Sequence, residues 1–184
     1  MKVVVAIDSL KGSLSSLEAG TAVSEGIHRC ISDAEVIVRP LADGGEGTVE
    51  ALACGMNGRI ENITVTGPLG EKVEAAYGII ENTNTAIIEM SAAAGIILVK
   101  EEDRNPLNTT TYGVGELICD AIKKGCRKFI IGIGGSATND GGIGMLQALG
   151  YDFLDTAGRN VPFGAKGLAL IQKISDEHVI PELK

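Results

Sequence analysis

"KVVVAIDSLKGSLSSLEAGTAVSEGIHRCISDAEVIVRP", residues 2–40, decides the fold class of this chain. It opens with a β-branched run that ends at Asp8, a pattern typical of a strand buried on both faces. A second β-branched run at 35–40 predicts another strand. Between the two, Ser15 and Glu18 have the spacing of a capping box that begins a helix. A strand, a helix and a strand in this order predict a parallel βαβ unit and therefore an α/β protein.

The remainder of the chain continues this pattern with a mixed sheet. Runs at 58–66, 71–80 and 85–90, separated by turn-forming residues, predict successive hairpin strands. Segment 108–125 predicts a helix with a Thr cap, and 127–133 predicts a buried strand. The apolar face of the first helix comprises Leu17, Val23, Ile27, Cys30 and Ile31. That of the later helix comprises Val114, Leu117, Ile118, Ala121 and Ile122.

The composition narrows the classes of partner. A net charge of −8 argues against nucleic acid and anionic membranes, because both attract basic patches. The four cysteines lack C-x-x-C spacing and are expected to be reduced thiols. No secretory signal is recognisable, and no apolar run reaches the length of a transmembrane helix. We therefore expect a cytoplasmic protein.

Three glycine-rich stretches combine acids with hydroxyl side chains, each after a predicted strand: the first loop (8–16), the second loop (42–48) and the third loop (134–142). In open α/β sheets, ligands collect at the C-terminal ends of strands. Glycine lets backbone N–H groups converge on an anion, which predicts phosphate binding. The predicted phosphate- and substrate-binding residues are Ser9, Ser13, Gly44, Gly45, Gly47, Thr48, Gly134, Gly135, Ser136, Thr138, Asn139, Gly141 and Gly142.

The acids in these loops need a separate explanation. Asp8, Asp43, Glu46 and Asp140 would repel a bare phosphate. They fit a site where Mg²⁺ lies between carboxylate and phosphate, or where one acid is a base that deprotonates an attacking hydroxyl. Lys11 is the cation suited to meet a phosphate or a substrate carboxylate.

Each of these features also has a purely structural interpretation. A single glycine-rich loop after a strand is often only a tight turn, and Asp8 or Asp43 is placed to cap the next helix. Lys11 by itself resembles an ordinary surface lysine. Arg39 and Arg104 are weaker candidates for carboxylate recognition, because nothing in their sequence surroundings singles them out.

A competing motif overlaps the third loop. Gly132, Gly134 and Ala137 fit the dinucleotide fingerprint G-x-G-x-x-[GA], with Asp152 and Asp155 near the place of a ribose-binding acid. This alternative predicts an NAD(P)-binding oxidoreductase. It requires a helix that runs on directly from the motif, whereas "TNDGG" delays the helix, so we rank it second.

The three loops together resemble a known family. "MKVVVAIDSLKGSLSS" (1–16), "PLADGGEGTVEAL" (40–52) and "GIGGSATNDGGIGMLQALG" (132–150) are similar to motifs of the glycerate kinase type-1 family. "EMSAAAGI" (89–96) and "RNPLNTTTYGVGELI" (104–118) resemble its intervening segments. The resemblance implies phosphorylation of D-glycerate by Mg-ATP, in most members to 2-phosphoglycerate, with ATP and Mg²⁺ as cofactors.

The resemblance also implies two α/β domains. Residues 1–65 would form part of a Rossmann-like or restriction-endonuclease-like parallel sheet that a C-terminal segment completes. Residues 66–184 would belong to an inserted flavodoxin-like domain of mixed α/β structure. Members of that family are much longer than this chain, so we expect self-association or association with a missing C-terminal half. A non-catalytic half-protein is the third alternative.

Within this interpretation each loop receives a role. We expect the third loop to cradle phosphates, with Asp140 near Mg²⁺. Asp43 is the favoured base and Glu46 the second choice, while Lys11 contacts a phosphate or carboxylate. Asp8 takes a metal or base role, and Asp8 and Asp43 can exchange roles without contradicting the sequence.

Overall fold

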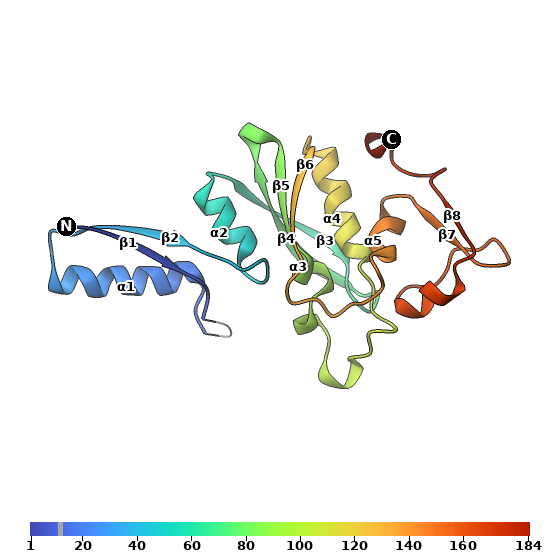
Figure 1. The fold of residues 1–184 in the computed structure, drawn as a ribbon, viewed down its shortest axis with the longest axis horizontal. Coiled ribbons are helices and arrows are strands. Elements are labelled where there is room, and N and C mark those ends of the chain that lie inside the picture. Colours follow the sequence, from blue (N-terminus) through green and yellow to red (C-terminus); the bar gives the residue numbers. More distant parts are fainter. Residues whose placement is uncertain (11–12) are drawn as a thin grey trace.

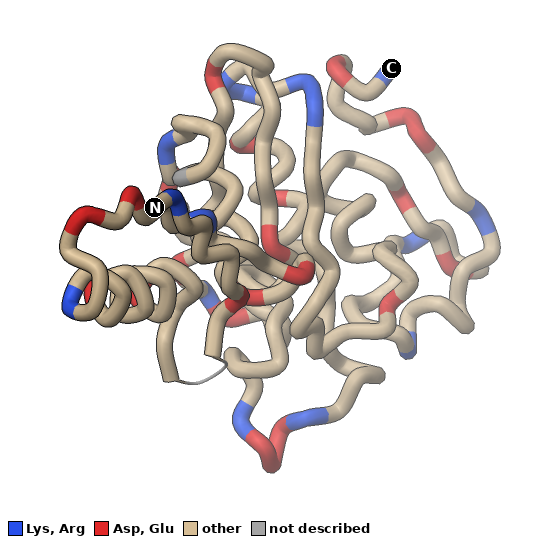
Figure 2. The backbone as a smooth tube through the Cα atoms, turned by 60° about the vertical axis from the view of Figure 1, so that its left-hand side comes forward, with Lys and Arg blue, Asp and Glu red and all other residues tan. Residues whose placement is uncertain are grey.

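The structure is a computed structural model, and it describes residues 1–10 and 13–184 (Figure 1). The helices are α1 (Ser16–Cys30), α2 (Thr48–Gly55), α3 (Met90–Ala94), α4 (Tyr112–Lys123) and α5 (Ile143–Ala148). The strands are β1 (Lys2–Ile7), β2 (Glu35–Pro40), β3 (Arg59–Thr66), β4 (Lys72–Ile80), β5 (Thr85–Glu89), β6 (Lys128–Gly132), β7 (Asp152–Leu154) and β8 (Lys173–Ser175). Acidic and basic residues are interspersed along the described chain (Figure 2).

The N-terminal βαβ unit is confirmed. Strands β1 and β2 pair in parallel, with Val4 opposite Ile37, and α1 connects them. The capping box is also confirmed, because the Glu18 amide donates to Ser15 Oγ at 3.2 Å and the Ser15 amide donates to Glu18 Oε2 at 2.8 Å. These reciprocal bonds satisfy amides that the first helical turn leaves without partners, so they define where α1 begins.

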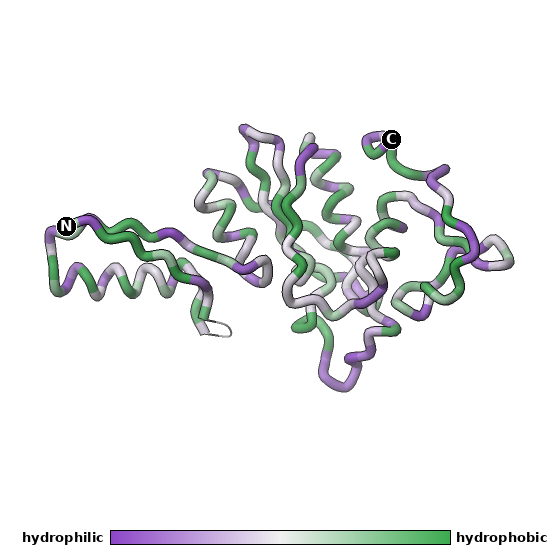
Figure 3. The backbone as a smooth tube through the Cα atoms, in the orientation of Figure 1, coloured by the Kyte–Doolittle hydropathy of each residue, from purple (hydrophilic) through white to green (hydrophobic). Residues whose placement is uncertain are grey.

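The prediction that the first strand is buried on both faces is wrong. Val5 is 8% exposed, whereas Val4, on the other face of β1, is 59% exposed. One helix covers this two-stranded sheet, and much of β1 and β2 is hydrophobic (Figures 1 and 3). The apolar stripe of α1 is also largely exposed, because the helix buries its small residues Ala19 and Gly20 instead. A methyl group at Gly20 would collide with Val38, so glycine permits this close helix–sheet packing.

A four-stranded mixed sheet forms the centre of the molecule, in the order β3-β4-β5-β6. The β3–β4 and β4–β5 pairs are antiparallel, which confirms the predicted hairpins, and β5–β6 is parallel. Helix α2 packs on one face through Val49 against Ile80 and Ile87. Helix α4 covers the other face. Since β3 begins at Arg59, this sheet starts before residue 66, where we expected the second domain to begin.

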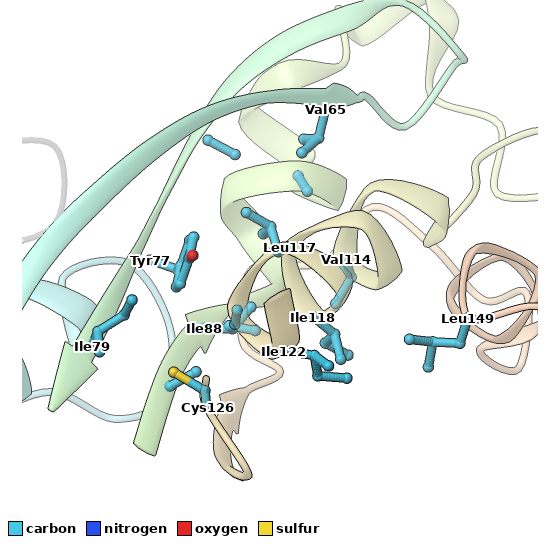
Figure 4. Close-up of a cluster of buried hydrophobic side chains, with 14 of the residues drawn as sticks. Val65, Tyr77, Ile79, Ile88, Val114, Leu117, Ile118, Ile122, Cys126 and Leu149 are labelled. Atoms are coloured by element: carbon cyan, nitrogen blue, oxygen red, sulfur yellow. The ribbon is translucent and has the colours of Figure 1, made fainter. Parts of the chain in front are cut away.

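The main core lies between α4 and the central sheet (Figure 4). All five apolar positions predicted for this helix are buried, which confirms its orientation. Beneath it the Tyr77 hydroxyl donates to Asp120 Oδ2 at 2.6 Å, and burial together with this carboxylate raises the pKa of Tyr77 to about 12. Strand β6 is an edge strand with Ile130 43% exposed, so its predicted burial is wrong.

Candidate active site

The three glycine-rich loops meet in the folded chain. Because β1 and β2 are parallel, their C-terminal ends are adjacent, and the Leu41 amide donates to the Ile7 carbonyl at 3.0 Å. The second loop then meets the third, where the Gly134 amide donates to the Gly44 carbonyl at 3.0 Å. Segments that are far apart in the sequence are therefore neighbours at the ends of β1, β2 and β6.

Glycine is required where the second and third loops touch. A methyl group on Gly134 would lie 2.8 Å from the Cα of Gly45, and one on Gly132 would overlap the Gly44 carbonyl. Only residues without a side chain allow these backbones to approach so closely. Part of the glycine excess that we assigned to phosphate binding thus serves loop–loop packing.

Several backbone amides of the expected phosphate cradle already have protein acceptors. The Gly134 amide donates to the Gly44 carbonyl, the Thr138 amide to Ser136 Oγ at 3.0 Å, and the Gly142 amide to Asp140 Oδ1 at 2.9 Å. These bonds fix the shape of the third loop. Its hydroxyl and amide side chains, rather than these amides, are therefore the groups available to a ligand.

A pocket of about 530 Å³ opens between the first and second loops. Four of the predicted residues line it: Ser9, Ser13, Glu46 and Gly47. Its remaining wall combines polar with apolar side chains, namely Leu14, Ser15, Ser16, Val49, Glu50, Ile60, Ala76, Glu89 and Ala92. The pocket offers serine hydroxyls and carboxylates above an apolar wall, a combination suited to a small polar substrate.

Glu89 is a pocket residue that sequence reasoning missed. It ends β5, and its Oε1 accepts the amide of Val49 at 2.6 Å, at the beginning of α2. Burial raises the pKa of Glu89, and the nearby Glu46 carboxylate acts in the same direction against the backbone hydrogen bonds. An acid at the end of the apolar run "TAIIEM" is the same signal that drew attention to Asp8, so it was open to recognition.

Asp8 and Asp43 hold turns at the ends of their strands. Asp8 Oδ1 accepts the Ser9 amide at 2.7 Å, and Asp43 Oδ1 accepts the Gly45 amide at 3.0 Å. The buried Thr48 hydroxyl donates to the Gly45 carbonyl at 2.8 Å and so closes the second loop onto α2. Neither aspartate caps a helix with these bonds. Lys11, the predicted cation, lies outside the described residues.

Asp140 anchors the third loop from inside the protein. It is 1% exposed, and its Oδ2 accepts the Thr111 amide at 2.9 Å and the Gly144 amide at 3.2 Å. Its Oδ1 accepts the Gly142 amide, and the Thr111 hydroxyl donates to the same carboxylate. The carboxylate thus ties the starts of α4 and α5 together, and it has no open side for the magnesium ion that we expected beside it.

The predicted polar residues of the third loop other than Asp140 face a different pocket, of about 340 Å³. Ser136, Thr138 and Asn139 line it together with Arg104 and Thr109. Gly135 adopts a positive φ of 70° against Ser91, and Gly141 and Gly142 also have positive φ. Glycine at these positions allows the positive φ angles that the loop adopts between β6 and α5.

Comparison with known proteins shows the family of this chain. The sequence model described as "Glycerate kinase family" matches residues 3–184. The chain belongs to the glycerate kinase family. It is 50% identical over 184 residues to a glycerate kinase of Haemophilus influenzae, covering all of this chain and 49% of the relative. It is 49% identical to a glycerate 2-kinase of Escherichia coli, again covering all of this chain and 48% of the relative.

A solved structure supports the same family assignment for this chain. The crystal structure of a putative glycerate kinase 2 from Salmonella typhimurium LT2 superimposes with a TM-score of 0.87 at 49% identity. The match covers 97% of this chain and 48% of that one. The chain thus spans about half the length of the family relatives that it matches.

The dinucleotide alternative is not favoured for this family member. Helix α5 begins only at Ile143, so no helix runs directly from the fingerprint. Gly132 and Gly134 pack against the second loop, which leaves no room there for a pyrophosphate. The acids proposed for ribose are engaged elsewhere, Asp152 with Asn160 and His178, and Asp155 with Arg159. None of the helices in the described residues combines the length and apolar character needed to cross a lipid bilayer.

Proposed function

We propose that this chain supplies half of the cleft of a glycerate kinase that transfers the γ-phosphoryl group of ATP to D-glycerate with Mg²⁺. Membership of the family and the half-length match to its relatives support this proposal. The observation that carries it is the pocket between the first and second loops, where Ser9, Ser13 and Glu46 meet. In this proposal the chain contributes to two domains, one with the N-terminal βαβ unit and one with the central sheet, and a further polypeptide segment completes the cleft.

Glu46 is the base favoured by the geometry. In-line phosphoryl transfer needs positioning and charge neutralisation, together with a group that accepts the proton of the attacking hydroxyl. Glu46 lines the pocket and is exposed to it, whereas the Asp43 carboxylate holds the turn at Gly45. The proton of the glycerate hydroxyl passes to Glu46 as the oxygen bonds to the γ-phosphorus and ADP leaves.

Asp8 and Asp43 are the residues suited to hold Mg²⁺. They follow adjacent parallel strands, β1 and β2, so their carboxylates belong to the same edge of the sheet. Among residues 1–10 and 13–184, no three acids, histidines or cysteines form a ready-made metal cage. Mg²⁺ in kinases is held by one or two carboxylates plus the phosphates, so this donor set fits. When bound, the ion neutralises charge on the phosphates.

The proposal is tested by measuring ADP release from Mg-ATP, with and without D-glycerate. The unmatched half of the Haemophilus influenzae relative is supplied as a separate chain where this chain alone is inactive. Glycerate-dependent release is expected, and Glu46→Gln should lower kcat by at least about 100-fold. Glu35→Gln, at the opposite end of β2, is the matched control and should change kcat little. Absence of glycerate-dependent release under both conditions would overturn the proposal.

We place the transferred phosphoryl group on the 2-hydroxyl of glycerate, supported by the name of the Escherichia coli relative, glycerate 2-kinase. Phosphorus-31 NMR of the product distinguishes the two positions. A phosphate on the secondary carbon couples to one proton and gives a doublet, whereas one on the primary carbon couples to two and gives a triplet. A triplet would contradict this regiochemistry while leaving the kinase assignment intact.

A further inference from the structure

The pocket of about 340 Å³ beside the third loop has a cation that the proposed mechanism does not use. Arg104 lines it from the segment that follows α3, and Ser136, Thr138 and Asn139 line it from the third loop. Apolar residues, Ile96, Val99, Pro106 and Ala137, form the rest of the wall together with Thr109. Its volume lies within the range of small-ligand sites.

The two walls of this pocket are fixed to each other by hydrogen bonds. The Ile96 amide donates to the Gly135 carbonyl at 2.8 Å, and the Ala137 amide donates to the Ala94 carbonyl at 2.8 Å. The Thr109 hydroxyl donates to the Ala137 carbonyl at 2.8 Å. Figure 1 shows the segment that follows α3 running below the sheet, near the loop that leaves β6. The pocket is thus preformed.

The Arg104 guanidinium uses one nitrogen in a hydrogen bond and has two terminal nitrogens that can donate to a ligand. Its Nε donates to the Val99 carbonyl at 3.3 Å, and its backbone amide donates to the Glu101 carbonyl. Within residues 1–10 and 13–184, no carboxylate forms an ion pair with this guanidinium, although three acids precede it in the chain. The lowest loop in Figure 2 shows these acids as a red stretch between two blue ones. The terminal nitrogens therefore remain as donors.

The facing wall contributes neutral donors. Ser136 Oγ and Thr138 Oγ1 lie 2.8 Å apart, so one of these hydroxyls donates to the other. The Thr138 amide also donates to Ser136 Oγ, which orients the pair. The exposed Asn139 side chain adds an amide, and no carboxylate lines the pocket. A guanidinium with hydroxyl and amide groups and no acid is the donor set for a polyoxyanion.

We propose that this pocket binds the phosphate chain of the nucleotide, with Arg104 as its cation. The assignment of this anion to ATP rests on the proposed function, whereas the anion site itself is inferred from the residues that line the pocket. Arg104 meets a phosphate with two parallel N–H donors, and the hydroxyl pair and Asn139 bind the opposite oxygens. The third loop thereby acts through side chains in place of the backbone cradle expected from its glycines.

The test is calorimetric titration of the chain with sodium tripolyphosphate, which carries the anion without the base or ribose. Arg104→Gln should weaken binding by about tenfold or more, because a charge-assisted hydrogen bond is lost. Lys100→Gln is the matched control, since it removes the same charge from the same segment without lining the pocket. The control should bind within about twofold of the unmodified chain. Circular dichroism checks that both variants fold.

Three results would overturn the site. These are equal weakening by the two variants, no measurable tripolyphosphate binding, or Arg104-dependent binding of D-glycerate without Arg104-dependent binding of tripolyphosphate. The proposed function is tested separately by ADP release. Arg104-dependent tripolyphosphate binding without glycerate-dependent ADP release would contradict the kinase proposal and leave the anion site supported.

Discussion

Two carboxylates inside the protein, Glu89 and Asp140, hold the loops of the site in position. Glu89 accepts the Val49 amide at the beginning of α2, where the helix dipole favours negative charge. Asp140 accepts amides from two helix starts and is almost completely buried. Both carboxylates affect the site without touching a substrate, because removal of either acceptor leaves amide donors without partners.

Glu89 predicts a particular pH dependence of stability. Burial raises its pKa above the value of 4.5 expected in the unfolded chain, so between these two pKa values the folded state binds more protons. The free energy of unfolding should therefore fall as the pH rises from 4.5 through the folded pKa. Glu89→Gln keeps an acceptor oxygen but does not titrate. The free energy of unfolding of this variant should therefore lack the fall that Glu89 causes in the unmodified chain.

Urea unfolding of the unmodified chain and of Glu89→Gln, from pH 4.5 to neutral pH, measures this difference in the pH dependence of stability. Glu25→Gln, on the exposed surface of α1, serves as control and should follow the unmodified chain at every pH. Parallel curves for the unmodified chain and Glu89→Gln would show that burial does not perturb this carboxyl.

The second and third loops act together as one structural element. Their contact joins the end of β2 to the end of β6 through backbone atoms of Gly44, Gly45 and Gly134. The second loop lines the pocket near Glu46 together with the first loop, and the third loop lines the pocket near Arg104 together with the segment after α3. Displacing one loop should therefore disturb both pockets.

Gly134→Ala tests this contact. The added methyl would meet the Gly45 backbone at 2.8 Å, so we expect a loss of about 2 kcal/mol in the free energy of unfolding. Gly26→Ala is the control, because a methyl there has nothing within 4 Å inside α1 and should stabilise the chain by about 0.5–1 kcal/mol. Urea unfolding measures both. Equal stability of Gly134→Ala and the unmodified chain would contradict the close packing of the loops.

The N-terminal unit leaves one face of its sheet uncovered. Val4 and Ile37 are neighbours across β1 and β2, on the face away from α1, and Val4 is 59% exposed. Hydrophobic strands that are open on one face and at both edges tend to associate. In the proposed two-domain arrangement, further polypeptide would cover this face.

Self-association of the isolated chain should follow from this face. Val4→Lys should weaken it by about tenfold, because burial of one valine contributes about 1.5 kcal/mol or more. Ala22→Lys adds the same charge on the exposed side of α1 and should leave association unchanged. Sedimentation equilibrium over a range of concentrations provides the measurement. Monomers at every concentration for all three proteins would contradict this prediction.

Local patterns determined most of the secondary structure and part of the site. The β-branched runs, the capping box at Ser15 and the apolar stripe on 108–125 depend on residues a few positions apart, and the structure confirms them. The first and second loops were recognisable because glycine, acids and hydroxyls follow strands directly. Ser9, Ser13 and Glu46 accordingly line the larger pocket, as their positions suggested.

Only the tertiary structure decided which polar groups of the site face solvent and which are used by the protein itself. Asp140 and Asp43 have the same residue type and similar glycine-rich surroundings, yet one is buried and the other exposed. Glu89 and Arg104 entered their pockets because distant segments pack beside them. The physical reason is that periodicity reflects the spacing of side chains along one element. Burial and hydrogen bonding depend on the element that packs against it.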